Sequence, residues 1–84
     1  MYVEIVLIGV FSGRRIPGFI GPFHDAEAAQ LWEERYRTHM ASQYGFPTES
    51  HVVAAVEAGK IVLAPLQPED AYQAVRQESI YLYR

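Results

Sequence analysis

The stretch IGPFHDAEAAQLWEERY, residues 20–36, contains the clearest change of structure in the sequence. An apolar run ends at a Gly-Pro pair, and a segment rich in Ala and Glu, with one Trp, follows at once. Asp25 is a suitable N-cap, because its carboxylate can accept a hydrogen bond from a free amide of the first helical turn. We therefore expect a strand to end at the Gly-Pro pair and a helix to run from Asp25 to about Tyr44, where Gly45 ends it.

The expected helix has one apolar and one polar side. Six residues recur on its apolar side at helical spacing: Ala28, Ala29, Leu31, Trp32, Tyr36 and Met40. His39 falls within this stripe, so we interpret it as a partly buried structural residue. On the polar side, Glu33 and Arg37 have the i, i+4 spacing that favours an ion pair.

Two extended segments precede this helix. Residues 2–11 alternate in the manner of a strand and are apolar on both sides beyond Glu4, which is typical of a central strand covered on both faces. The SGRR segment predicts a turn. Residues 16–23 would return as a hairpin, and Pro17, which cannot donate to a ladder, favours an edge strand.

The segments after the helix are less clear. For residues 46–60 the three valines favour a strand, whereas Thr48 as an N-cap and Gly59 past the end favour a short helix, the interpretation that we prefer. Residues 60–66 predict a short strand. A helix should begin at Pro68, and residues 79–84 would form a last short strand or an arm.

These elements predict one α+β domain over residues 1–84, with a core in 1–66 and a C-terminal helix and tail in 67–84 that could contact a second copy. We expect a small, mostly antiparallel sheet, made of the hairpin plus one or two further strands. It would pack against one long helix, with one or two shorter helices. Either the C-terminal helix or a second copy of the chain would cover the other face of the central strand.

Composition limits the classes of function. The chain has no cysteine, which excludes disulfides and thiolate metal sites. Its net charge of −3 speaks against binding to duplex nucleic acid. The apolar run near the N-terminus is too short to span a bilayer, so we expect no membrane partner and a cytoplasmic location. In a phage protein, that would be the host cytoplasm.

The residues that carry chemistry form no recognisable catalytic pattern. The three histidines have no metal-ligand spacing, the glycines match no phosphate loop, and no serine has a nucleophile context. A small enzyme with a shared site would need a pocket that pairs a histidine with a carboxylate. We therefore expect no enzyme activity, no metal and no cofactor.

The candidate interaction residues lie at the hairpin tip and in the C-terminal region. Arg14 and Arg15 could grip an anion or an acidic partner. Tyr72, Tyr81 and Tyr83 belong to a late excess of tyrosines, which bury area at interfaces while keeping a polar tip. The uncovered face of the first strand is a further candidate surface.

Three short motifs carry a resemblance to a known group of proteins. The segments IGPF, DAEAAQLW and IVLAPLQP resemble short uncharacterised proteins of actinobacterial phages and their hosts. That group shows a hairpin, a Gly-Pro-Phe step, an Ala/Trp helix and a closing Pro-Leu strand. Residues 46–58 would be an insertion and 68–84 an extension. More distantly, the Gly-Pro-Phe step before the helix is similar to that of SPOR domains, which bind cell-wall glycans.

Two function hypotheses follow. The first is a non-enzymatic protein-binding or accessory protein of phage or actinobacterial type, which self-associates as a homodimer and binds an unidentified host or phage protein. The alternative is a binder of single-stranded nucleic acid, in which Tyr81, Tyr83 and Arg84 stack and pair with a single strand beside the two hairpin arginines.

Overall fold

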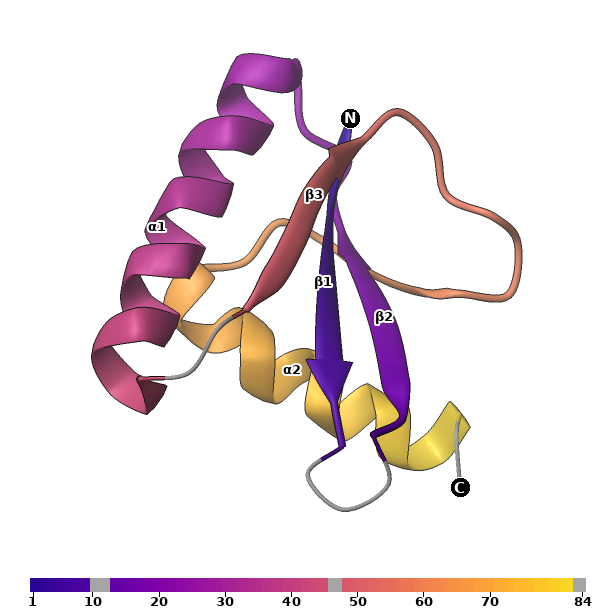
Figure 1. Cartoon of the computed structure of the whole chain (residues 1–84). Helices are drawn as coiled ribbons and strands as arrows, with labels where there is room; N and C mark the ends of the chain where they lie inside the picture. The colour runs from indigo at the N-terminus through magenta and orange to yellow at the C-terminus, as the bar shows by residue number, and fades with distance from the viewer. Residues whose placement is uncertain (10–12, 46–47, 83–84) are drawn as a thin grey trace.

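The computed structural model describes residues 1–9, 13–45 and 48–82, with side chains as far as Ser79. Four strands form one sheet and two helices pack on it (Figure 1). The elements are β1 (Tyr2–Ile8), β2 (Arg15–Ile20), α1 (Ala26–Tyr44), β3 (Glu49–Val53), β4 (Ile61–Leu63) and α2 (Pro68–Leu82). The expected α+β class is thus confirmed.

The sheet has the strand order β3-β1-β2-β4. β1 pairs antiparallel with β2 and with β3, so it lies inside the sheet as predicted. β4 pairs parallel with β2, and this makes the sheet mixed. The prediction of an edge position for β2 is therefore wrong. Pro17 is tolerated because the pairing with β4 begins only at Gly18, one residue later.

α1 begins and ends where the sequence predicts. The Asp25 carboxylate accepts a hydrogen bond from the Ala28 amide at 2.8 Å. At the other end Gly45 adopts a left-handed conformation (φ 68°), and its N–H donates to the carbonyl of Ala41. The Glu33–Arg37 ion pair also forms, at 3.4 Å.

Residues 46–60 and the C-terminal region differ from the prediction. Residues 49–53 form strand β3 instead of the preferred short helix, because their valines pair with the apolar β1 along one edge of the sheet. Residues 79–82 continue helix α2 instead of forming a strand or an arm. The described residues thus contain two helices, of 19 and 15 residues, which does not match one long helix with one or two shorter ones.

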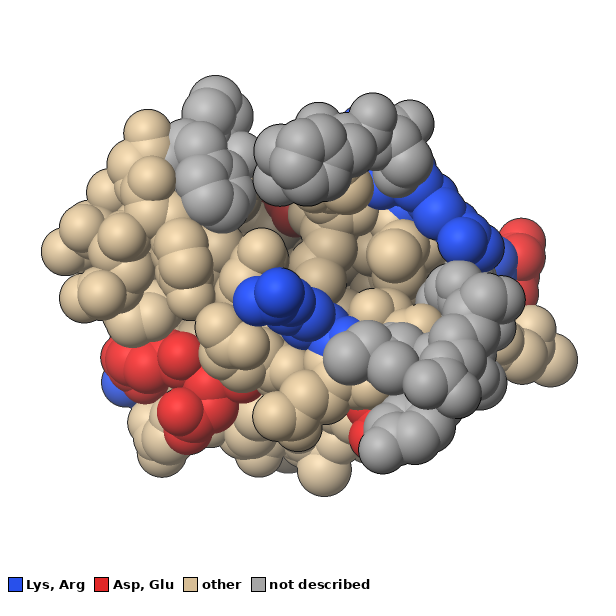
Figure 2. Space-filling model, turned by 90° about the horizontal axis from the view of Figure 1, so that it is seen from below, with Lys and Arg blue, Asp and Glu red and all other residues tan. Residues whose placement is uncertain are grey.

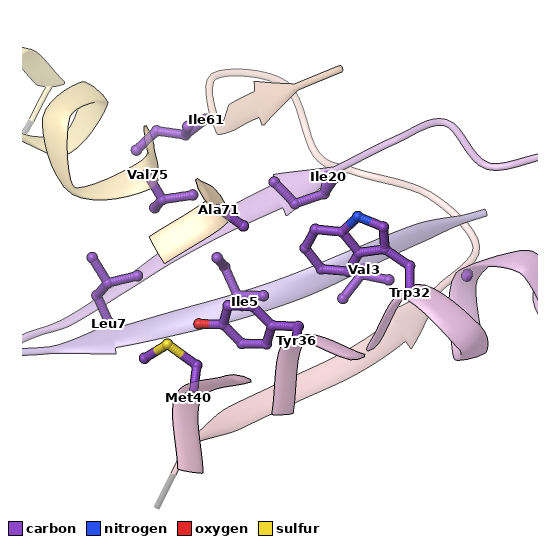
Figure 3. Close-up of a cluster of buried hydrophobic side chains, with 11 residues drawn as sticks. Val3, Ile5, Leu7, Ile20, Trp32, Tyr36, Met40, Ile61, Ala71 and Val75 are labelled. Carbon is purple, nitrogen blue, oxygen red and sulfur yellow. The ribbon is translucent and has the colours of Figure 1, made fainter. Parts of the chain in front are cut away.

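Both helices cover the same side of the sheet. Figure 3 shows side chains of α1 and α2 converging on Val3, Ile5 and Leu7 of β1. Trp32, Tyr36 and Met40 of α1 and Ala71 and Val75 of α2 are the main helical contributors to this core. Burial raises the pKa of the Tyr36 hydroxyl far above its usual value. The C-terminal helix therefore does not cover the second face of β1, contrary to one of the two alternatives.

Glycines let α2 and the N-terminus approach the sheet closely. A Cβ at Gly18 would lie 2.5 Å from Cγ1 of Val75, so only glycine admits α2 at this distance. A Cβ at Gly21 would lie 2.6 Å from the Tyr2 ring. The Gly-Pro-Phe segment pairs with the N-terminus here, since the Phe23 amide donates to the carbonyl of Met1 at 2.7 Å.

Candidate interaction surface

The side of the sheet opposite the helices is here called the outer face. It consists of the even-numbered residues of β1, the odd-numbered residues of β2 and β3, and Val62 of β4, as the strand registers require. The other, inner face bears Val3, Ile5 and Leu7 and is sealed by the two helices. No element of the described residues packs as a layer against the outer face.

The outer face carries large exposed apolar side chains. Ile8 is 52 % exposed and Val62 is 47 % exposed, and they lie on different strands of the same face. Val6 and Val53 are half-buried. Because exposed apolar side chains on a sheet face without a helix layer are available to a partner, this face is a candidate for a binding surface.

A hollow lies at one end of the outer face. It has a volume of about 320 Å³ and is lined by Glu4, Pro17 and Phe19 together with Val53, Ala55, Glu57 and Lys60. The last three of these residues belong to the β3–β4 loop. Phe19, only 7 % exposed, provides its buried aromatic wall. The lining combines apolar surface with carboxylates and an ammonium group.

One ion pair crosses the outer face. Arg15 at the start of β2 reaches over β1 and binds Glu49 at the start of β3. The hydrogen bond from Arg15 is the main cause that holds the pKa of Glu49 below its usual value, and the same bond raises the pKa of Arg15. Both side chains remain partly exposed, so the pair lies on the surface and not under it.

Among the predicted interaction residues that the structure describes, Arg15 and Tyr72 lie on opposite sides of the sheet. Arg14 and Arg15 are exposed beside the hairpin turn, on the outer-face side for Arg15. Tyr72 lies on the helical side, half-buried, with its ring 5.1 Å from that of Tyr44. Residue 81 belongs to the backbone of α2, and its side chain lies outside the described part. Tyr83 lies outside the described residues altogether.

Within the part of the chain that the structure describes, basic side chains do not gather into one patch at the hairpin end. Seen from this end, Lys and Arg side chains lie at separate places, and Asp and Glu side chains form one larger group and smaller ones elsewhere (Figure 2). The Arg15 guanidinium also forms an ion pair with the Glu49 carboxylate. The single-strand platform also needs Tyr81, Tyr83 and Arg84, whose side chains lie outside the described part of the chain, so it stays a prediction.

A second hollow lies on the helical side. It has a volume of about 540 Å³ and a polar lining: Glu34, Arg35, Thr38, His39, Ser42 and Glu69. Arg35 binds Glu69 at 3.3 Å. The pKa of Glu69 is lowered, chiefly by the hydrogen bond from its own backbone amide and then by Arg35. Arg35 thus compensates the charge of Glu69 within the chain. The hollow also brings His39 into one lining with the carboxylates of Glu34 and Glu69, the combination of groups that the enzyme alternative requires.

Two residues of the outer face escaped the sequence prediction. Glu49 lies in the segment for which the sequence favours a short helix, and the strand that pairs with Val62 could not be identified from the sequence. The face of Ile8, by contrast, was identified as a candidate because β1 is apolar on both sides. The alternating apolar residues of β1 were the signal that the sequence offered for this face. The pairing of β1 with β3 and of β2 with β4 was the information that it lacked.

The remaining observations concern membranes, metals and known proteins. Within the described ranges, neither helix is long and apolar enough to span a membrane. In the same part of the chain, no three His, Asp or Glu side chains come together to hold a metal ion. No family model matches the chain, and neither the curated proteins nor the solved structures contain a match to it.

Proposed function

We propose that the protein is a non-enzymatic protein-binding module that self-associates through its outer face. The observation that carries this proposal is the exposure of Ile8 and Val62 on a sheet face that no helix of the described chain covers. The molecule measures 35 × 32 × 17 Å, which is one sheet layer and one helix layer. A second copy would add the layer that the outer face lacks.

A second copy is the partner that the charges of the outer face fit. The face and its rim carry Glu4 and Glu49 as well as Arg15 and Lys60. A face of one sign would select a partner of the opposite sign, whereas a mixed face can be complementary to itself. Two-fold symmetry brings such a surface against its own copy, so that each contact occurs twice.

The size of the face predicts a weak dimer. Four strands at about 4.8 Å spacing and about 20 Å length offer roughly 400 Å² of flat area. Stable interfaces bury about 800 Å² on each partner. The contact must therefore include the β3–β4 loop beside the hollow, and we expect an equilibrium that depends on protein concentration.

The experiment is sedimentation velocity over a range of protein concentrations. Ile8→Lys places a charge on the most exposed apolar side chain of the outer face and should shift the equilibrium to monomer. Leu31→Lys is the matched control, because Leu31 is 57 % exposed but lies on α1, on the helical side. We expect wild type and the control to associate equally.

Two outcomes contradict the proposal. One is a wild-type chain that stays monomeric at every soluble concentration, and the other is equal loss of association in both Lys variants. A wild-type chain that stays monomeric but binds a specific host protein through Ile8 would replace the second copy by a different partner.

The biological setting is part of the same proposal. The resemblance of the Gly-Pro-Phe step and the following helix to small proteins of actinobacterial phages supports an accessory role in a phage or its host. The same setting implies the cytoplasm and an additional host or phage protein as partner. Purification of the Ile8→Lys variant alongside wild type from such a host would test whether one surface serves both contacts.

A further inference from the structure

The hollow at one end of the outer face brings together charges of both signs. Glu4 lies on β1, whereas Glu57 and Lys60 lie on the β3–β4 loop, which leaves the sheet as a wide arc (Figure 1). All three residues line the same volume of about 320 Å³. Glu4 is half-buried, and Glu57 and Lys60 are exposed. The lining thus contains a half-buried carboxylate, an exposed carboxylate and an exposed ammonium group.

These charges are not paired with one another. In the part of the chain that the structure describes, no ion pair joins Lys60 to Glu4 or to Glu57. His51 faces Glu4 across the β1–β3 pair, but it is exposed, and no hydrogen bond is formed between the two side chains. Groups of opposite charge therefore border one hollow and stand apart across it. A ligand that carries both charges can fill the space between them.

The rest of the lining is apolar. Pro17, Phe19, Val53 and Ala55 complete the hollow, and Phe19 is the cross-strand neighbour of Glu4. An aromatic wall therefore stands directly beside the half-buried carboxylate. Small-molecule sites combine apolar walls with a few placed polar groups and have volumes of roughly 300–1,000 Å³. The hollow lies at the lower end of that range, which suits one small molecule.

We propose that the hollow binds a free α-amino acid with an apolar side chain. The ammonium group of the ligand lies between the carboxylates of Glu4 and Glu57, its carboxylate binds the ammonium group of Lys60, and its side chain packs on Phe19. A ligand of one charge fits less well, because a charge that is covered without a partner opposes binding. The inference goes beyond the proposed function and does not rest on it, since one copy of the chain supplies the whole site.

Three probes separate the two charges of the ligand. L-Leucine carries both, isopentylamine is the same molecule without the carboxylate, and isocaproate is the same molecule without the amine. Titration of isotope-labelled protein, followed by NMR, measures each dissociation constant from the amide signals of Phe19, Val53 and Lys60. We expect saturable binding of L-leucine and at least about tenfold weaker binding of the other two, because each loses a charge-assisted hydrogen bond.

Two variants assign the charges to residues. Lys60→Gln should weaken the binding of L-leucine about tenfold, because its carboxylate loses a charged partner, and should not weaken the binding of isopentylamine. Glu4→Gln should weaken the binding of L-leucine and isopentylamine and should not weaken that of isocaproate. The matched controls are Arg76→Gln and Glu78→Gln, which make the same changes of charge at exposed positions of α2, on the helical side. Both controls should bind L-leucine as wild type does.

The amide spectrum of each variant verifies its fold. Where Glu4→Gln does not fold, Glu57→Gln on the exposed loop provides the corresponding test. Absence of a saturable shift with L-leucine in the wild type overturns the inference. Equal affinities of the wild type for L-leucine and isopentylamine also overturn it, since Lys60 then makes no contact with a carboxylate. So does a control variant that weakens binding as much as the variants of the hollow.

The failures of the two proposals are distinguishable. The titration is made at protein concentrations below the association range, so that only the monomer is tested. A negative titration therefore leaves the outer face as the proposed interface between copies. A wild-type chain that never associates leaves the amino-acid site unaffected.

Discussion

The two faces of β1 have nearly the same residue types but different environments. Ile5 on the inner face is fully buried between the two helices, whereas Ile8 on the outer face is 52 % exposed. On the inner face, Gly18 and Ser50 are the cross-strand neighbours of Ile5. Both are small, and the absence of a side chain at Gly18 lets α2 approach the sheet. The comparison shows that alternating apolar residues identify two apolar faces of a strand, and that the fold of the described chain covers only one of them with helices.

The largest expected effect compares the same substitution on the two faces. Ile5→Ala should lower the free energy of unfolding by about 2–5 kcal/mol, because it removes buried methyl groups and leaves a cavity. Ile8→Ala should cost less, about 0.5–1 kcal/mol, since about half of the residue is already exposed and no enclosed cavity is left. Urea unfolding of the monomer, at protein concentrations below the association range, measures both.

The effects of these two substitutions on self-association should have the opposite order to their effects on stability. Ile8→Ala is expected to weaken self-association, while Ile5→Ala, where it folds, should leave it unchanged. A cost for Ile8→Ala as large as that for Ile5→Ala would mean that the outer face belongs to the core of a single chain.

An intermediate effect is expected at Gly18, on the inner face. Gly18→Ala forces a methyl group against Val75 and should cost about 1–3 kcal/mol in the free energy of unfolding. Val75→Ala removes the obstructing atoms, so the double variant should be more stable than the sum of the two single changes predicts. Strict additivity in urea unfolding would mean that α2 does not pack on Gly18 in solution.

The smallest effect is expected from the ion pair on the outer face. The folded-state pKa of Glu49 lies below its usual value of 4.5. Its contribution to stability is therefore present above that value and is lost as the pH falls through the lowered pKa. Glu49→Gln should reduce the stability of the monomer slightly at pH 7 and not at all once wild-type Glu49 is protonated. Equal differences at pH 7 and in strong acid would exclude this origin.

The sequence predicted α1 and the hairpin best because their information is local. Asp25 and Gly45 are cap residues whose roles depend on neighbours within one turn. The alternation in residues 2–8 likewise defines a strand and its two faces without any distant partner. Arg15 and the outer face of β1 could be identified as candidates for the same reason.

The remaining elements depend on partners far away in the sequence. Glu49 belongs to β3 only because β1 offers an unpaired edge, and no local pattern near residue 49 records that edge. β2 became internal because the three residues of β4 pair with Gly18–Ile20. The Arg15–Glu49 pair combines two such contacts, so it could not be predicted before the strand order was known.

The β3–β4 loop joins the two opposite edges of the sheet. The hairpin can form from residues close in sequence, whereas the parallel β2–β4 pair joins residues far apart and needs a costly loop closure. We therefore expect the sheet to assemble outward from β1 and β2, with β4 as the last strand. The Trp32 indole donates to the Leu66 carbonyl at 2.7 Å. This bond would hold the segment between β4 and α2 to helix α1, which can form earlier.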